Sequence, residues 1–242
     1  MIKITKLTKK FGDNTVIDDI SLEIPEGQKL AVIGPSGCGK STLLRLLIRL
    51  EEPTKGAIFY NDTDISSLKE EGLIKMRSKI GMVFQSSALF DSMNVFENIA
   101  FGLRQQGIAD EGYITKKVLE KLKMVDLEGS EDLMPSELSG GMQKRVSLAR
   151  AIASDPKVIL YDEPTTGLDP VTSTVIEDLM NKLTSTMNAT AVIVTHQLST
   201  IFRTSDRIIM LHEGRAIETG DVEETRNTSD PIVRNFIKGG LG

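Results

Sequence analysis

Short apolar runs recur along the chain, separated by stretches whose apolar residues follow helical spacing. Runs of this length are typical of buried strands, and their alternation with helices predicts an α/β fold with a mainly parallel sheet. The predicted strands are residues 30–33, 56–60, 79–84, 157–161 and 191–194. The predicted helices are 43–50, 66–76, 144–153 and 231–238, with a further helix that follows the turn at 167–170 and runs through 183.

Three other segments depart from this alternation. Residues 2–30 show alternating polar and apolar positions between turns at 12–14 and 25–27, which predicts half-exposed strands. Residues 86–137 lack strand signals, and their helical spacing at 95–103 and 114–124, separated by Gly107 and Gly112, predicts a helical insertion. Residues 207–218 predict a hairpin whose turn contains His212, to which we assign no role.

A glycine-rich segment lies between the predicted strand at 30–33 and the helix at 43–50. Gly34, Gly39, Lys40 and Ser41 have the spacing G-x-x-x-x-G-K-S, and this context favours a phosphate-binding loop over a turn that merely joins two elements. Lys40 can bridge the β- and γ-phosphates of a nucleotide, and the Ser41 hydroxyl can ligate Mg²⁺. The predicted nucleotide-binding residues of this loop are Gly34, Pro35, Ser36, Gly37, Cys38, Gly39, Lys40, Ser41 and Thr42.

Polar side chains follow three of the predicted strands. Asp162 ends one strand and Glu163 follows it, where a carboxylate can hold Mg²⁺ through water and its neighbour can act as a general base. Adjacent carboxylates on a strand point to opposite sides unless the backbone turns, so different roles are natural. Gln85 and His196 also follow strands, where the first could reach a metal or an attacking water and the second a γ-phosphate. From the residues alone, a surface position fits Gln85 about equally well, and a lone histidine is usually structural.

A second candidate anion site begins at Ser139. This residue is a good helix N-cap, and Gly140 and Gly141 follow it at the start of the predicted helix. Because the chain already has a phosphate loop, the second site either binds another ligand or serves a nucleotide held by another subunit. Phe11, before the turn at 12–14, is either a platform for an adenine ring or a local core anchor.

Composition narrows the class of protein. The net charge of −5 gives no support for general nucleic-acid binding. Cys38 is the only cysteine, which suits a reducing compartment, and we interpret it as a small loop filler rather than a redox sensor. No apolar run approaches the roughly 18–20 residues that span a bilayer. We therefore expect any membrane attachment to come through a partner.

Taken together, these motifs resemble those of an ATP-binding cassette (ABC) ATPase over essentially the whole chain. The phosphate loop, Gln85, the signature 138–143, the strand ending at Asp162 and Glu163, the turn 167–170 and His196 follow in family order and spacing. The resemblance implies a P-loop NTPase core with a mainly parallel sheet, an antiparallel β subdomain and a helical subdomain. Residues 1–242 would be one nucleotide-binding domain, with core and antiparallel parts at 1–85 and 154–242 and a helical subdomain at 86–153.

The resemblance also implies roles and partners. Two copies of the chain would pair head to tail around two ATP molecules, with Ser139, Gly140 and Gly141 of one facing the γ-phosphate bound by Lys40 of the other. Glu163 would be the base and His196 would polarise the γ-phosphate. Ser41 and Gln85 would ligate Mg²⁺, Asp162 would act on it through water, Asp169 would couple the two sites, and Phe11 would stack on adenine.

A narrower resemblance lies in residues 84–98, 133–138 and 230–236, which are similar to the ATPases of MCE-linked phospholipid transporters of the Mla type. It implies an integral membrane permease, an MCE-domain lipid-binding protein and a possible STAS-domain subunit as partners, at the cytoplasmic face of the inner or plasma membrane. An importer ATPase for amino acids or other small solutes would have identical catalytic residues. A soluble ABC ATPase acting on DNA or ribosomes and a slowly hydrolysing nucleotide-gated scaffold are competing classes with less support in the sequence.

Overall fold

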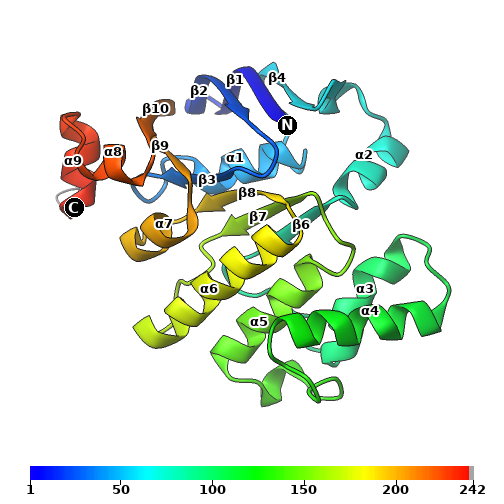
Figure 1. Cartoon of the computed structure of the whole chain (residues 1–242). Coiled ribbons are helices and arrows are strands. Elements are labelled where there is room, and N and C mark those ends of the chain that lie inside the picture. Colours follow the sequence, from blue (N-terminus) through cyan, green and yellow to red (C-terminus); the bar gives the residue numbers. More distant parts are fainter. Residues whose placement is uncertain (240–242) are drawn as a thin grey trace. The chain divides into compact units, whose positions relative to one another are not determined.

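The computed structural model describes residues 1–239, and they fall into two compact units (Figure 1). The first unit consists of Met1–Lys75 together with the described residues from Thr190 onward, and the second unit is Met76–Ala189. Each unit contains parallel strands and helices, as the alternation of apolar runs predicts. No described helix is long and apolar enough to cross a membrane.

An antiparallel sheet forms the N-terminal part of the first unit, with strand order β2-β1-β4-β5. Ile2, Ile4 and Leu7 are its buried apolar residues on β1, although strict alternation would bury position 6 rather than 7. Lys6 has a left-handed backbone (φ 46°), and the pairing of β1 with β2 shifts register here. This bulge moves Leu7 onto the buried face. The strands are β1 (Ile2–Phe11), β2 (Asn14–Ile24), β4 (Lys55–Tyr60) and β5 (Thr63–Asp64).

A second set of strands in the first unit has the order β10-β9-β3-β8. β3 pairs in parallel with both β8 and β9, and β10 pairs antiparallel with β9. β3 and β8 are almost entirely buried, which explains their continuous apolar sequence. The bounds are β3 (Lys29–Ile33), β8 (Thr190–Val194), β9 (Arg207–His212) and β10 (Arg215–Gly220), so His212 ends a strand rather than lying in the predicted turn.

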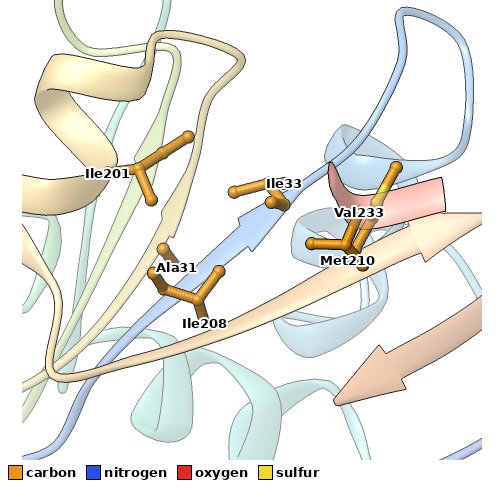
Figure 2. Packing of buried hydrophobic residues seen from close by; sticks show 6 residues of the cluster. All are labelled: Ala31, Ile33, Ile201, Ile208, Met210 and Val233. Carbon is orange, nitrogen blue, oxygen red and sulfur yellow. The ribbon is translucent and has the colours of Figure 1, made fainter. Parts of the chain in front are cut away.

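A buried cluster joins the closing helix of the chain to these strands. Figure 2 shows Ile33 of β3 and Met210 of β9 beside Val233 of the closing helix, and Ile201 comes from a helix that follows β8. All four side chains are fully buried. Because Ile33 directly precedes Gly34, this cluster supports the strand that carries the phosphate loop. The helices of the first unit are α1 (Lys40–Leu47), α7 (Leu198–Thr204), α8 (Val222–Arg226) and α9 (Pro231–Ile237).

The second unit contains a parallel strand pair and four long helices. It also includes the last two residues of a helix that begins in the first unit, α2 (Glu70–Arg77). β6 pairs with β7, in register from Ile80 opposite Val158. The predicted helical insertion contains α3 and α4, but the prediction that Gly112 separates two helices is wrong. Asp110 caps α4 by accepting from the Tyr113 N–H, which places Gly112 in the first turn. The bounds are β6 (Ile80–Val83), β7 (Val158–Asp162), α3 (Val95–Gln105), α4 (Glu111–Met124), α5 (Gly140–Ala151) and α6 (Pro170–Thr186).

Two further element predictions differ from the structure. The helix expected at 66–76 is a 3₁₀ turn at Ile65–Ser67 followed by α2 (Glu70–Arg77), because the Asp64 side chain caps the short turn through the Ser66 N–H. A 3₁₀ turn also occurs at Pro135–Glu137. Helices α7 and α8 are absent from the predicted elements, since segments of seven and five residues are too short to show a helical period.

An ion-pair cluster fastens α4 to the loop between α5 and β7. The Asp155 carboxylate accepts from Lys117 Nζ at 2.6 Å and from Lys121 Nζ at 2.5 Å, and Lys121 is buried. Burial of Asp155 acts to raise its pKa, but the two lysine hydrogen bonds outweigh burial and hold the pKa below its usual value. The ion pairs of Asp155 therefore stabilise the fold at pH values above the ordinary aspartate pKa. This stabilisation is lost as the pH falls through the lowered pKa of Asp155.

We expect Asp155→Asn to lower the free energy of unfolding by about 1 kcal/mol at pH 7, discounted because the carboxylate is half exposed. The difference from the parent should shrink as the pH falls below about 4, where the parent carboxylate becomes protonated. Urea unfolding of the variant and the parent at several pH values measures this difference in the free energy of unfolding. Asp126→Asn is the matched control, because Asp126 is exposed and has the same left-handed backbone as Asp155. A constant difference across this pH range would contradict the assignment.

Candidate functional site

The phosphate loop occupies residues 34–39, between the end of β3 and the start of α1. Gly34 (φ 146°) and Gly39 (φ 105°) both have backbone conformations that L side chains rarely adopt. A Cβ on Gly34 would collide with the Leu211 carbonyl oxygen, and a Cβ on Gly39 would lie 2.9 Å from Cγ1 of Val16. The two glycines are therefore required both by backbone conformation and by close packing within the first unit.

Lys40 lies at the first position of α1 and is buried. Its Nζ donates to the carbonyl oxygens of Gly34 and Pro35, at 2.8 and 2.9 Å. The first turn of α1 contains no acidic residue, so no side chain of that turn offsets the positive end of the helix. A side chain on Gly37 would meet only open space. Curled backbone, a helix N-terminus and an ammonium group form a donor set that fits a polyphosphate.

The remaining residues of this loop are Ser36, which is exposed, and Pro35, Cys38, Ser41 and Thr42, which are half-buried. Burial raises the pKa of the Cys38 thiol, and the Lys40 charge opposes this shift without overcoming it. The thiol is therefore kept protonated, which agrees with its interpretation as a loop filler.

Two other predicted site residues lie in the first unit. Phe11 ends β1 and is 46% exposed, and the Lys9 ammonium lies 4.6 Å from the ring centroid. The exposure fits a stacking platform better than a core anchor. His196 is exposed, two residues beyond the end of β8. Its two neighbours in the chain are joined by a hydrogen bond, in which the hydroxyl of the buried Thr195 accepts from the Gln197 N–H.

The carboxylates Asp162 and Glu163 stand at the end of β7 in the second unit. The strand ends at Asp162, and Glu163 has a left-handed backbone with φ 49°. The left-handed backbone at Glu163 frees the two side chains from the strict alternation of a strand. No neighbouring residue in the sequence predicts this conformation. Glu163 is 9% exposed, and Thr166 Oγ1 donates to its Oε2 at 3.2 Å.

Gln85 is exposed on the loop that follows β6. The backbone carbonyl oxygen of Gln85 accepts a hydrogen bond from Nζ of Lys144, a buried residue of α5. Burial lowers the pKa of Lys144, and the charges of Asp162 and Glu163 oppose this shift. Lys144 is missing from the predicted site residues, because a lysine on a helix is ordinarily exposed and only the packing shows that this one is not.

The signature segment forms the start of α5. The Ser139 hydroxyl accepts from the Met142 N–H at 3.2 Å, which confirms the predicted N-cap. A Cβ on Gly141 would lie 2.8 Å from Cγ2 of Thr172, so a side chain there would press on α6. Ser139, Gly140 and Gly141 line a cleft of about 470 Å³ together with Gly167 and Asp169. The cleft therefore opens at the N-terminal ends of α5 and α6.

The structure groups the predicted residues by unit. The phosphate loop, Phe11 and His196 belong to the first unit, and Gln85, Ser139, Gly140, Gly141, Asp162 and Glu163 belong to the second. Among residues 1–239 there is no group of three or more His, Cys, Asp or Glu residues that could hold a metal by themselves. A hydroxyl, an amide and a carboxylate (Ser41, Gln85 and Asp162) are oxygen donors of the kind that suits Mg²⁺, which normally takes its other ligands from phosphates and water.

Comparison with known families identifies the fold and its activity. A family model described as "ABC transporter" matches residues 17–166, a stretch that runs from β2 past Glu163 and covers more than half of the chain. The chain belongs to the ABC transporter family. It is an ATP-binding subunit and an ABC-type ATPase that hydrolyses ATP, and the predicted fold class is confirmed.

Individual relatives agree with this assignment. The chain is 39% identical over 239 residues to the intermembrane phospholipid transport system ATP-binding protein MlaF of Haemophilus influenzae, covering 99% of this chain and 90% of that protein. It is 42% identical over 243 residues to the methionine import ATP-binding protein MetN of Geobacillus kaustophilus, covering 98% and 71%. Among solved structures, the dimeric ATP-binding cassette MJ0796, in a post-hydrolysis state with ADP and Pi, matches with a TM-score of 0.83 and 35% identity, covering 92% and 99%.

Proposed function

We propose that this ABC ATPase is the motor subunit of a transporter that moves phospholipid between membranes in an MCE-linked system. The observation that carries the proposal is the similarity to MlaF over nearly the full length of both chains. Residues 84–98, 133–138 and 230–236 are the segments in which the sequence resembles the Mla-type ATPases most specifically, and they support the same proposal.

In this proposal the first unit binds the nucleotide. The N–H groups of the phosphate loop and the Lys40 ammonium hold the β- and γ-phosphates, and Phe11 stacks on the adenine ring. Lys40 exchanges its bonds to the Gly34 and Pro35 carbonyls for bonds to phosphate oxygens. Ser41, Gln85 and, through water, Asp162 would hold Mg²⁺, which neutralises charge on the phosphates when it is bound.

Hydrolysis is an in-line attack of water on the γ-phosphorus. Glu163 takes the proton from the attacking water, and ADP departs as the bond from the γ-phosphorus to the bridging oxygen breaks. His196 donates a hydrogen bond to the γ-phosphate and stabilises its developing charge. The hydrogen bond from Thr166 restricts the orientation of the Glu163 carboxylate, which supports its role as the base.

The second copy of the chain completes the site. The cleft at Ser139, Gly140 and Gly141 offers the positive end of α5 to the γ-phosphate held by the other copy. The dimeric state of MJ0796, 35% identical to this chain, supports such a pair. Asp169 caps α6 through the N–H groups of Val171 and Thr172 and couples the two sites from the same cleft.

A permease would dock on a groove of about 500 Å³ in the second unit. Met82, Phe84, Phe90 and Phe101 line it, and the rings of Phe90 and Phe101 lie 4.8 Å apart between centroids. The Asn98 side chain fixes Phe90 by accepting from its N–H and donating to its carbonyl oxygen. An apolar groove next to the Gln85 loop suits one short helix of an integral membrane protein at the cytoplasmic face. An MCE-domain protein and a STAS-domain subunit complete the proposed assembly.

A small-solute importer is the second candidate function, because the identity to MetN is 42%. The catalytic residues of the two candidates are the same, so the discriminating evidence must come from partners. We expect purification of the N-terminally tagged chain in mild detergent to retain a permease, an MCE-domain protein and phospholipid, all identifiable by mass spectrometry. A solute-importer permease would overturn the phospholipid proposal, and recovery of no membrane protein would favour a soluble ABC ATPase.

A pair of variants tests the docking groove in the same purification. Phe90→Ala should remove most of the permease from the purified material while leaving ATP binding unchanged, since Phe90 lines the groove. Tyr113→Ala is the matched control, because Tyr113 is a similarly exposed aromatic residue on α4, outside the lining of the groove. Equal recovery of the permease with both variants would refute docking at this groove.

A further inference from the structure

Helix α5 holds the loop that carries Gln85 through two cations. Lys144 Nζ donates to the carbonyl oxygens of Phe84, at 3.3 Å, and Gln85. Less than two turns along the helix, Arg150 donates from Nη1 to the Ala88 carbonyl oxygen at 2.6 Å and from Nη2 to the Ser87 carbonyl oxygen at 2.9 Å. Four carbonyl groups of one short loop are thus bound by side chains of a single helix.

The loop has a conformation that its own sequence does not favour. Ser87 and Ala88 have φ values of 58° and 49°, and two consecutive left-handed residues without glycine are costly. The guanidinium group of Arg150 reaches the carbonyl groups of both residues, one from each terminal nitrogen. Arg150 therefore compensates the strain of the turn that follows Gln85.

The electrostatic surroundings of Lys144 include the charges of Asp162 and Glu163. Lys144 is 4% exposed, and these charges act on its ammonium group. A buried lysine is expensive unless it has hydrogen-bond acceptors and opposite charges, and Lys144 has two carbonyl acceptors and two carboxylates whose charges partly offset its burial. We propose that Lys144 is a positioning residue for ATP hydrolysis, which fixes the Gln85 backbone relative to Asp162 and Glu163, and that Arg150 holds the adjoining turn.

This proposal rests on the proposed role of Gln85 at the Mg²⁺ site, and it deepens that role. A residue that orients a metal ligand typically contributes about 10–100-fold to activity or metal affinity. Lys144→Gln should therefore lower kcat by about tenfold and raise the Mg²⁺ concentration for half-maximal hydrolysis. The Kd for ATP without Mg²⁺ should stay unchanged, because Lys144 contacts neither the phosphate loop nor Phe11 in the proposed site.

The experiment compares full-length chains carrying Lys144→Gln, Lys144→Arg and Lys123→Gln. Lys123→Gln is the matched control, since its side chain is 75% exposed on α4. Hydrogen exchange of the amides at 84–88 is measured by mass spectrometry, beside kcat and its Mg²⁺ dependence. Faster exchange and slower turnover in Lys144→Gln, with recovery of both in Lys144→Arg and parental behaviour in Lys123→Gln, are the expected results.

Unchanged exchange at 84–88, or unchanged kcat, in a folded Lys144→Gln chain would overturn the proposal. If that variant does not fold, Arg150→Lys serves instead, because one ammonium nitrogen on a shorter side chain cannot occupy the positions of both Arg150 nitrogens that bond Ser87 and Ala88. This variant should speed exchange at 87–88. Gln85→Ala, measured in parallel, separates the proposed role of Gln85 at the Mg²⁺ site from the proposed positioning role of Lys144. Parental turnover in Gln85→Ala removes the role of Gln85, whereas the exchange data still decide whether Lys144 positions the loop.

Discussion

Glu163→Gln should bind ATP as the parent does and hydrolyse it about 10²–10⁴-fold more slowly, the usual contribution of a general base. The amide has nearly the volume of the carboxylate and can still accept the hydrogen bond from Thr166, so the end of β7 should keep its structure. What it loses is the ability to take the proton of the attacking water. Steady-state phosphate release and equilibrium ATP binding give the two quantities.

Two further observations make the Glu163 result specific. With ATP the variant should accumulate as a dimer by size-exclusion chromatography, since unhydrolysed ATP stays bound between the two proposed copies. Glu213→Gln is the matched control, because Glu213 is exposed and also left-handed, with φ 48°. It should hydrolyse ATP at the parental rate. Parental turnover in Glu163→Gln would show that another group is the base.

Lys40→Ala should weaken ATP binding by about 10–100-fold, which corresponds to loss of one hydrogen bond between charged groups of roughly 1.5–3 kcal/mol. The buried ammonium is the cation of the loop, and its present partners, the carbonyl groups of Gly34 and Pro35, lie in that loop. Hydrolysis should fall as well, because the γ-phosphate is no longer held for attack. Binding of a fluorescent ATP analogue and phosphate release are the measurements.

Lys55→Ala is the control for Lys40→Ala. Lys55 is exposed at the start of β4 in the same unit, so its removal changes the net charge equally without touching the phosphate loop. Thermal unfolding of both variants checks that the fold persists. Preserved ATP affinity together with normal turnover in Lys40→Ala would refute the assignment of residues 34–42.

Local chemistry made much of the fold predictable. The apolar runs at β3, β7 and β8 are continuous because these strands are buried, and continuous burial leaves a direct trace in sequence. The N-cap at Ser139 was also predictable from local sequence, since its hydroxyl accepts from an N–H only three residues away. The glycine spacing of the phosphate loop belongs to this class, because only glycine adopts the φ of Gly34 and Gly39 without strain.

Other features were decided by tertiary structure, since they depend on contacts between distant segments. The bulge at Lys6, which buries Leu7, depends on pairing between β1 and β2. The left-handed Glu163 and the burial that raises the pKa of Cys38 leave no mark in the neighbouring residues. The sequence by itself thus determined the family, the glycine spacing of residues 34–39 and the candidate catalytic residues, because each is encoded by residues close together in the chain. Only the tertiary structure decided how Lys144 holds the Gln85 loop, because these residues are 59 positions apart and meet through packing.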